Sequence, residues 1–278
     1  MTTESASLFG PAGTMVGIVT HPSAEARKDV AILMFNAGVL PRIGPRRMNV
    51  KLARALAAAG HVCCRFDLSG QGDSRGAATA VDFSTQALHD IQAAMNHLET
   101  THGIRRFALV GVCSGAVHCF KAAQHDRRVV GALMFDGHSY HTRWSRAVRH
   151  WARFREASWP GVLASARRLL RAGSGNGDIS NEAQGRGTRW STNNPPRDQF
   201  IAALQAIVDR GARMLFVYSG SAIEYYSYAG QFRHAFGKEP FINEVGVAFR
   251  PDIDHTFVSL QAQQGLIQLT LEWADRLG

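Results

Sequence analysis

The sequence predicts an α/β fold in which a mainly parallel sheet carries helices on both faces. Strand-like and helix-like segments alternate over most of the 278 residues, which is the pattern of a parallel sheet covered on both sides. Residues 107–112 form a short, wholly apolar run, as expected of a strand that is buried on both faces. The alternation breaks after residue 136, so we expect an insertion at this point.

Period-2 and period-3.6 patterns locate the individual elements. Strands are predicted at residues 15–20, 30–35, 61–66, 107–112, 129–135, 214–218 and 241–249. Helices are predicted at residues 45–59, 83–98, 114–124, 198–210, 225–236 and 259–277. In the first of these helices Met48, Leu52 and Leu56 recur at i, i+4 and i+8, and Gly60 follows at its end.

The insertion has a different character from the rest of the chain. Residues 138–170 predict one or two arginine-rich helices, and residues 172–197 are rich in Gly, Ser, Asn and Pro, which is typical of a long loop. We therefore expect a core made of residues 1–136 and 198–278, with a cap and mobile loop at 137–197.

The composition is that of a soluble globular protein, with 45% hydrophobic and 19% charged residues. No apolar run approaches the roughly 18 residues of a membrane helix, and the first residues do not resemble a signal peptide. We therefore expect a cytoplasmic protein without a membrane span. Its four cysteines, Cys63, Cys64, Cys113 and Cys119, are too few for a disulfide framework, so reduced thiols are expected.

Positive charge is concentrated in the insertion. The formal net charge is +9, and residues 142–171 contain eight arginines against one acid, Glu156. Such a block can attract an acidic partner. A solvated helical face explains the same pattern equally well.

The stretch Gly111-Val112-Cys113-Ser114-Gly115 lies between a predicted strand and a predicted helix. This Gly-x-Cys-x-Gly arrangement is the nucleophile-elbow pattern, in which a tight turn lifts the central side chain above the sheet edge. The helix N-terminus at this place favours a thiolate. Cys113 is therefore the candidate nucleophile, the Ser114 hydroxyl is its rival, and a buried structural cysteine is the alternative interpretation.

Three short motifs carry a family resemblance: Asn36-Ala-Gly38, the segment Phe-Asp-Leu-Ser-Gly-Gln-Gly-Asp-Ser at residues 66–74, and the cysteine elbow. Together they resemble the α/β-hydrolase superfamily and, more narrowly, the exosortase A system-associated hydrolases. The resemblance runs from about residue 15 to the C-terminus and is weakest across the cap. It implies an α/β-hydrolase fold with an eight-stranded, mainly parallel sheet and a helical cap after strand six. Dienelactone hydrolases and polyhydroxyalkanoate synthases also have a cysteine elbow, so hydrolysis and transfer are both compatible with it.

The superfamily pattern implies a base and an acid late in the chain. His255 lies on the loop between the last predicted strand and the last helix, which is the superfamily's place for the base. The orienting acid usually follows the seventh strand, which makes Glu224 the first choice and Asp136, after the sixth strand, the alternative. Asp252 and Asp254 are too close to His255 in sequence to point at its ring. A Cys–His pair can also work with a weak third member or none.

Two backbone N–H groups are expected to form an oxyanion hole, one from Ser114 and one from Val39, with Gly38 allowing the close approach. Residues 66–74 predict a structured turn, because Gly70-Gln-Gly72 lacks the third glycine and the helix of a dinucleotide fingerprint. His138 and His141 have no Cys or carboxylate cluster beside them that would make a metal site. No cofactor and no metal are therefore predicted.

These observations predict an esterase, thioesterase or acyltransferase that works through an acyl-cysteine intermediate. A thiolate exchanges readily with thioesters, and the arginine-rich cap fits an acyl group carried on coenzyme A or an acyl carrier protein. The alternative is a non-catalytic binding protein on the same scaffold, which docks an anionic partner such as nucleic acid or a membrane surface through the basic cap. Tryptophans and a phenylalanine among the arginines favour core-facing cap helices, so nucleic acid is not the partner we expect.

Overall fold

The computed structural model describes residues 2–23, 27–77, 81–148 and 194–277. These residues form one eight-stranded sheet in the order β1-β2-β4-β3-β5-β6-β7-β8. The strands are β1 (Thr3–Phe9), β2 (Met15–His21), β3 (Val30–Met34), β4 (Cys63–Phe66), β5 (Arg106–Val112), β6 (Val129–Phe135), β7 (Arg213–Ser219) and β8 (Gly246–Arg250). Only the β1–β2 and β2–β4 pairs are antiparallel, so the predicted eight-stranded, mainly parallel sheet is confirmed.

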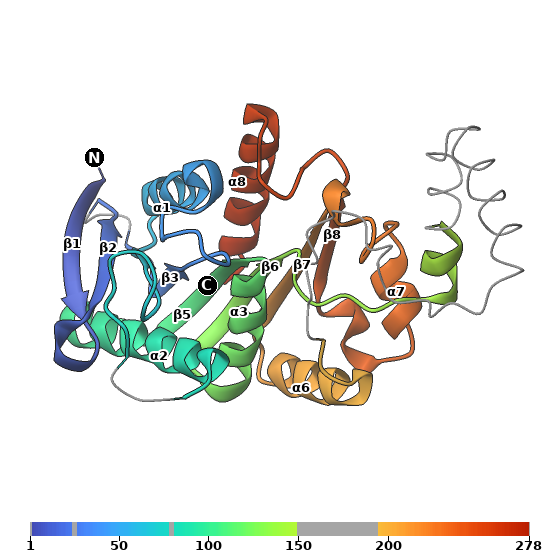
Figure 1. The fold of residues 1–278 in the computed structure, drawn as a ribbon, viewed down its shortest axis with the longest axis horizontal. Helices are drawn as coiled ribbons and strands as arrows, with labels where there is room; N and C mark the ends of the chain where they lie inside the picture. Colours follow the sequence, from blue (N-terminus) through green and yellow to red (C-terminus); the bar gives the residue numbers. More distant parts are fainter. Residues whose placement is uncertain (1, 24–26, 78–80, 149–193, 278) are drawn as a thin grey trace, which may run out of the picture.

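Helices cover both faces of this sheet (Figure 1). On one face lie α1 (Met48–Ala58) and α8 (Leu260–Ala274), and on the other lie α2 (Phe83–His102), α3 (Ser114–His125) and α6 (Arg197–Asp209). The short helix α7 (Gln231–Phe236) lies near β8. Single 3-10 turns occur at η1 (Pro11–Gly13), η3 (Pro45–Arg47), η4 (Gly220–Ala222) and η5 (Pro240–Asn243).

Strand residues alternate between two hydrophobic cores. Ala31 and Leu33 of β3 pack with the α2, α3 and α6 side, whereas Val30, Ile32 and Met34 pack with the α1 and α8 side. All five side chains are almost fully excluded from water. Because each large apolar side chain buried in this way stabilises the fold by about 1.5–3 kcal/mol, the two cores fix the strand register and hence the positions of the strand ends.

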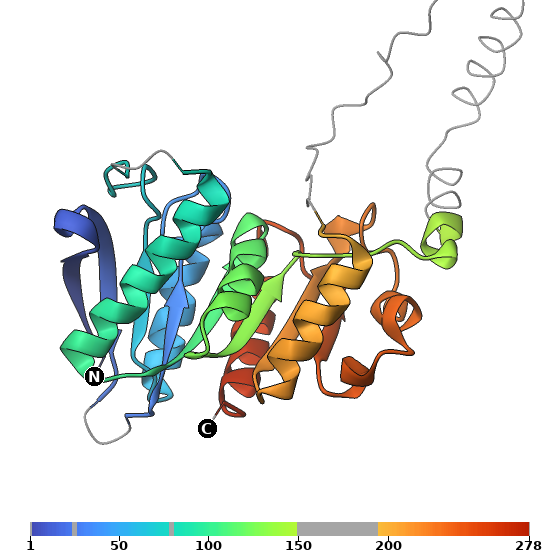
Figure 2. The ribbon, with the colours of Figure 1, turned by 90° about the horizontal axis from the view of Figure 1, so that it is seen from below.

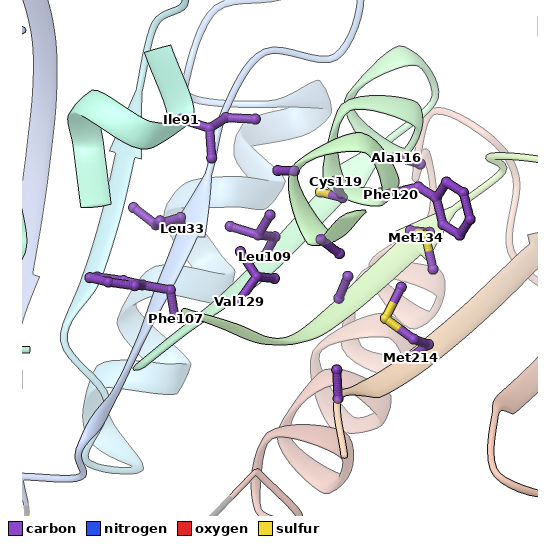
Figure 3. Packing of buried hydrophobic residues seen from close by; sticks show 14 of the residues in the cluster. Leu33, Ile91, Phe107, Leu109, Ala116, Cys119, Phe120, Val129, Met134 and Met214 are labelled. Atoms are coloured by element: carbon purple, nitrogen blue, oxygen red, sulfur yellow. The ribbon is translucent and has the colours of Figure 1, made fainter. Parts of the chain in front are cut away.

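Figure 3 shows part of the larger core, in which Leu33 and Leu109 of the sheet lie on the same side as Cys119 of α3. Cys119 is completely buried and packs behind the start of α3. A Cβ added at Gly111 would come within 2.6 Å of the Cys119 sulfur, so the strand and the helix approach as closely as their backbones allow. This packing sets the position at which the chain turns from β5 into α3.

The strand that the sequence analysis did not locate is β1. Most of its residues are exposed and polar, so it lacks the apolar alternation of a half-buried strand. It is held instead by pairing with β2 and by Glu4, which forms ion pairs with Arg54 (3.0 Å) and with the buried Arg65 (3.0 Å).

Two predicted elements near the C-terminus are shorter than expected. The predicted strand at 241–249 begins as η5, where Pro240 starts a helical turn, and β8 covers only Gly246–Arg250. The predicted helix at 225–236 is reduced to α7. The side chain of Gln231 accepts a hydrogen bond from the N–H of Ser227 (2.8 Å) and donates one to the carbonyl of Tyr225 (2.7 Å), so it replaces helical backbone bonds in this segment.

The predicted cap falls mostly outside the described residues. Residues 143–148 are helical, in agreement with the predicted arginine-rich helix, and residues 149–193 lie outside the description. The division into core and cap therefore stays a prediction. Within the described ranges, no helix combines the length and apolarity needed to cross a membrane.

A buried carboxylate fixes the loop that follows β3. Asp67, the first residue after β4, is fully buried and accepts hydrogen bonds from the backbone N–H of Arg42 (2.6 Å) and of Asp73 (3.1 Å). The Arg42 guanidinium forms an ion pair with the same carboxylate, and a second one with Asp73 at 2.7 Å. Asn36 links the two loops again, because it accepts from the N–H of Leu68 (2.7 Å) and donates to the carbonyl of Leu40 (3.0 Å).

This arrangement explains why the motif at residues 66–74 contains Gly72. Its φ is +51°, and a Cβ there would collide with the carboxylate of Asp67. The predicted structured turn is therefore confirmed, and its purpose in the fold is to hold the loop after β3 against the sheet.

We expect Asp67→Ala to lower the free energy of unfolding by about 3 kcal/mol, because it leaves the half-buried Arg42 without its buried partner. Asp73→Ala is the matched control: its side chain is 67% exposed, and its loss is expected to cost less than about 1 kcal/mol. Urea denaturation of the two variants measures the difference. If the two variants lose equal free energies of unfolding, burial of the Asp67 carboxylate does not account for its contribution to stability.

Candidate active site

The elbow places Cys113 at the turn between β5 and α3. Its backbone lies at φ 57° and ψ −119°, a strained conformation for a residue with a side chain. A Cβ at Gly111 would strike the backbone of Gly115, and one at Gly115 would lie 2.9 Å from the carbonyl oxygen of Asn36. Both glycines are therefore required by close approach, as the elbow pattern predicts.

Cys113 is the accessible thiol among the four free cysteines. It is half-buried, whereas Cys63, Cys64 and Cys119 are completely buried. Burial raises the pKa of Cys64 to about 12 and raises the pKa values of Cys63 and Cys119 further still. These three thiols behave as small apolar groups, which leaves Cys113 as the accessible thiol.

His255 lies on the loop between β8 and α8, as predicted. The loop is shaped by Asp254, whose carboxylate accepts hydrogen bonds from the N–H groups of Thr256 (2.9 Å) and Val258 (2.8 Å). The N–H of His255 donates to the hydroxyl of Ser221 at 3.2 Å, which ties the loop to the segment after β7. The ring of Phe257 is buried and packs against Phe135 of β6, which holds the loop against the sheet.

Asp136 is the carboxylate that holds the imidazole. It directly follows β6, and its Oδ2 lies 2.7 Å from Nδ1 of His255. Ser219, the last residue of β7, donates to the same carboxylate from its N–H (2.7 Å) and from its hydroxyl (2.6 Å). The Asp136 side chain is 5% exposed, so these three donors compensate for its burial.

The structure therefore places Asp136, the alternative acid, at Nδ1 of His255. Glu224 is exposed and lies in the turn after η4, whereas the Nδ1 position of His255 is taken by Asp136, the alternative. The physical reason is that β7 ends in Ser219, which supplies hydrogen-bond donors and not a carboxylate. The sequence signal for Ser219 was only a hydroxyl at a strand end, and its part in the site was not predicted.

Hydrogen bonds make His255 an unusually strong base. Burial lowers the pKa of its imidazole, but hydrogen bonds with Asp136 and with Cys113 outweigh this effect and raise the pKa to about 9. Since Nδ1 faces Asp136, Nε2 is the nitrogen left to face the sulfur.

The expected oxyanion loop lies directly against the elbow. Residues 37–40 form a turn closed by the N–H of Leu40 and the carbonyl of Ala37 (3.1 Å), with Gly38 at φ +59°. The N–H of Gly38 donates to the hydroxyl of Ser114 at 2.8 Å, a contact that the sequence did not reveal. Val39 as a whole residue is 89% exposed in this turn. The backbone N–H groups of Val39 and Ser114 remain the predicted oxyanion donors.

The other polar residues that were considered as candidates pack against, or form polar contacts with, neighbouring residues. His138 is buried, and its Nδ1 lies 3.1 Å from Asn194, while His118 is buried against Phe83 with its pKa lowered to about 4. Asp252 forms an ion pair with Arg250 at 2.6 Å. Across the described residues, no three His, Cys, Asp or Glu side chains converge in an arrangement that could hold a metal ion.

Several solved structures have a similar fold. An α/β serine hydrolase without a lid from Xanthomonas campestris is 15% identical, with 99% of this chain and 94% of that chain covered and a TM-score of 0.56. A serine hydrolase homologue from Coxiella burnetii is 15% identical over 97% and 96% of the two chains (TM-score 0.57). A Pyrococcus furiosus esterase is 11% identical over 100% and 91% (TM-score 0.61).

No curated protein sequence matches this chain. The family model described as the alpha/beta hydrolase fold matches residues 43–266, which include the elbow, Asp136 and His255. With the eight-stranded sheet, the elbow geometry and this match over most of its length, the chain belongs to the α/β-hydrolase fold family.

Proposed function

We propose that this protein hydrolyses or transfers acyl groups through a covalent intermediate on the sulfur of Cys113. The observation that supports this most directly is the 2.7 Å hydrogen bond between His255 and Asp136, with Cys113 close enough to His255 to help raise the pKa of the imidazole. Asp136 orients the ring and stabilises its positive charge, His255 handles the proton, and Cys113 supplies the nucleophile. The triad is therefore Cys113, His255 and Asp136, with an elbow cysteine in the place where serine is commoner.

Acylation begins with attack of the Cys113 thiolate on the carbonyl carbon of the substrate. As the carbon–sulfur bond forms, the carbonyl electrons move to oxygen, and the N–H groups of Ser114 and Val39 stabilise this oxyanion. The N-terminus of α3 adds its positive dipole at the same point. When the carbonyl re-forms, the leaving group departs and takes a proton from Nε2 of His255.

Deacylation reverses the part played by His255. The neutral imidazole accepts a proton from water or from an acceptor hydroxyl or thiol, which attacks the acyl carbon. The tetrahedral intermediate then expels the Cys113 thiolate, and the imidazolium that formed remains beside Asp136. Water as the nucleophile gives hydrolysis, and any other acceptor gives transfer, so one site serves both outcomes.

The substrate class that fits best is an acyl ester or thioester, and thioesters suit a thiolate because the exchange is close to isoenergetic. The eight arginines at residues 142–171 favour an acyl group carried on an anionic molecule such as coenzyme A or an acyl carrier protein. The three motifs that resemble exosortase A system-associated hydrolases support a place in that narrower group. Structural neighbours named as serine hydrolases and an esterase support acyl chemistry in general.

Cys113 is expected to be the residue that iodoacetamide alkylates rapidly, because the other three thiols are buried and their pKa values are raised. Intact mass spectrometry after incubation with a panel of acyl thioesters and esters is expected to show one acyl adduct. The adduct is absent from Cys113→Ala and present in Cys64→Ala, the matched cysteine control. Slow or unselective alkylation would favour a binding protein over an enzyme.

The rate of acylation, measured as kcat/KM, is expected to fall as pH rises through about 9, because His255 then loses the proton that the leaving group needs. Asp136→Asn removes the negative charge that raises this pKa, so the alkaline limb moves to lower pH and kcat falls at least about tenfold. Glu224→Gln is the control and leaves the pH profile in place. If Glu224→Gln shifts the alkaline limb of the pH profile and Asp136→Asn does not, Glu224 is the orienting acid.

Acyl-CoA is expected to react about tenfold faster than the same acyl group on pantetheine at low ionic strength, if basic residues attract the nucleotide part of coenzyme A. Salt screens this attraction, so the ratio of the two rates moves toward one as ionic strength rises. A neutral aryl ester serves as the salt control. If the two thioesters react at equal rates at all salt concentrations, the substrate's carrier need not be anionic.

A further inference from the structure

A hollow of about 360 Å³ lies at the edge of the sheet opposite to Cys113. Arg106, one of its lining residues, begins β5, whereas Cys113 follows the end of the same strand. Seven residues of extended chain separate them, which places the hollow roughly 20 Å from the sulfur. Whatever binds here therefore lies away from the proposed acyl chemistry.

Half of the residues that line this hollow are arginines, and none of them is acidic. They come from the starts of β5 and β7, from the segment after α3, and from the C-terminal ends of α6 and α8. Figure 2 shows these last two ends together, with the C-terminus beside the end of α6. The five residues are Arg106, Arg127, Arg210, Arg213 and Arg276.

Two of the arginines are fixed in place. Arg210 donates to the carbonyl oxygens of Ala123 and of Val129 (3.1 Å). Arg106 donates to the carbonyl of Leu277 (2.9 Å) and forms an ion pair with Asp29 (2.6 Å). These guanidinium groups are therefore ordered before any ligand arrives, which lowers the entropy cost of binding.

The other three arginines are exposed and carry uncompensated charge. Among the described residues, no carboxylate forms an ion pair with Arg127, Arg213 or Arg276. Burial lowers the pKa of Arg210, the positive charge of Arg127 lowers it further, and Asp126 offsets part of this effect, so Arg127 and Arg210 repel each other. An anion between them would relieve this repulsion.

Helix dipoles account for only part of the cluster. The C-terminal ends of α3, α6 and α8 meet here, and each contributes roughly half a negative charge. Together with Asp29 they balance about half of the five guanidinium charges, which leaves an excess of between about two and three positive charges. If these arginines served only to cap the C-terminal ends of helices, the hollow would not carry an excess of positive charge.

We propose that this hollow binds a small phosphorylated anion. A phosphate or pyrophosphate group carries two or more negative charges on a compact set of oxygens, which matches the excess charge. Arginine forks bind phosphate oxygens in pairs, and no lysine lines the hollow. The volume suits a small molecule better than a macromolecular surface, and it lies within the range of ligand pockets. The site is independent of the acyl chemistry proposed for Cys113.

The test is isothermal titration calorimetry. The intact protein is titrated with inorganic pyrophosphate and, separately, with ADP, in a magnesium-free buffer at low salt. Saturable binding of one ligand per chain is expected, with an affinity that falls as salt is added. Arg213→Glu and Arg276→Glu are each expected to weaken binding at least about tenfold. Both side chains are exposed, and the melting temperature of each variant checks that it folds.

Arg233→Glu on α7 is the control, since it makes the same charge change at an exposed position outside the hollow. Arg213→Lys separates phosphate recognition from simple attraction, because it keeps the charge and loses the fork, and we expect intermediate affinity. The proposal is overturned if the unmodified chain shows no saturable binding at millimolar ligand. It is also overturned if Arg233→Glu weakens binding as much as Arg213→Glu does. Neither outcome bears on acylation of Cys113.

Discussion

The hydrogen bond between Asp136 and His255 is the contact on which the geometry of the site depends. It joins the end of β6 to the loop after β8 and crosses β7, whose last residue, Ser219, donates two further bonds to the carboxylate. Three adjacent strands are thereby tied together at their carboxyl ends. A carboxylate so deeply buried is stable only with such donors, and the bond to Nδ1 leaves Nε2 as the imidazole nitrogen available to the sulfur of Cys113.

Local strain is concentrated at the same edge of the sheet. Cys113 and Asp136 follow neighbouring strands, and both have positive φ angles, 57° and 50°, although neither is glycine. Each such conformation costs on the order of 1–3 kcal/mol, which the packing of β5 and β6 in the two cores offsets. The strain points both side chains out of the sheet and toward the loop that carries His255. A site of this kind therefore requires the rigid parallel strands beneath it.

The sequence predicted those parts of the fold and site that rest on local patterns. The elbow glycines, the apolar run at residues 107–112 of β5 and the late histidine each left a short-range signal, and the structure places all three at the expected elements. The choice of acid could not be made locally, because it depends on whether β6 or β7 ends in a carboxylate that reaches Nδ1. Residues 3–9 were missed because β1 is an exposed edge held by Glu4 and not by apolar alternation. The bond from Gly38 to Ser114 joins residues far apart in sequence and left no pattern at all.

The two edges of the sheet stabilise charges of opposite sign, and the direction of the helix dipoles explains both preferences. In a parallel sheet the connecting helices run antiparallel to the strands, so helix N-termini gather at the carboxyl edge and helix C-termini at the other. At the carboxyl edge the start of α3 favours a thiolate and an oxyanion. At the opposite edge the ends of α3, α6 and α8 favour cations, and five arginines meet there. The dipoles explain why arginines are tolerated at that edge but do not balance all of them. The remaining charge makes the second edge suited to an anion of its own, roughly one strand length from the sulfur.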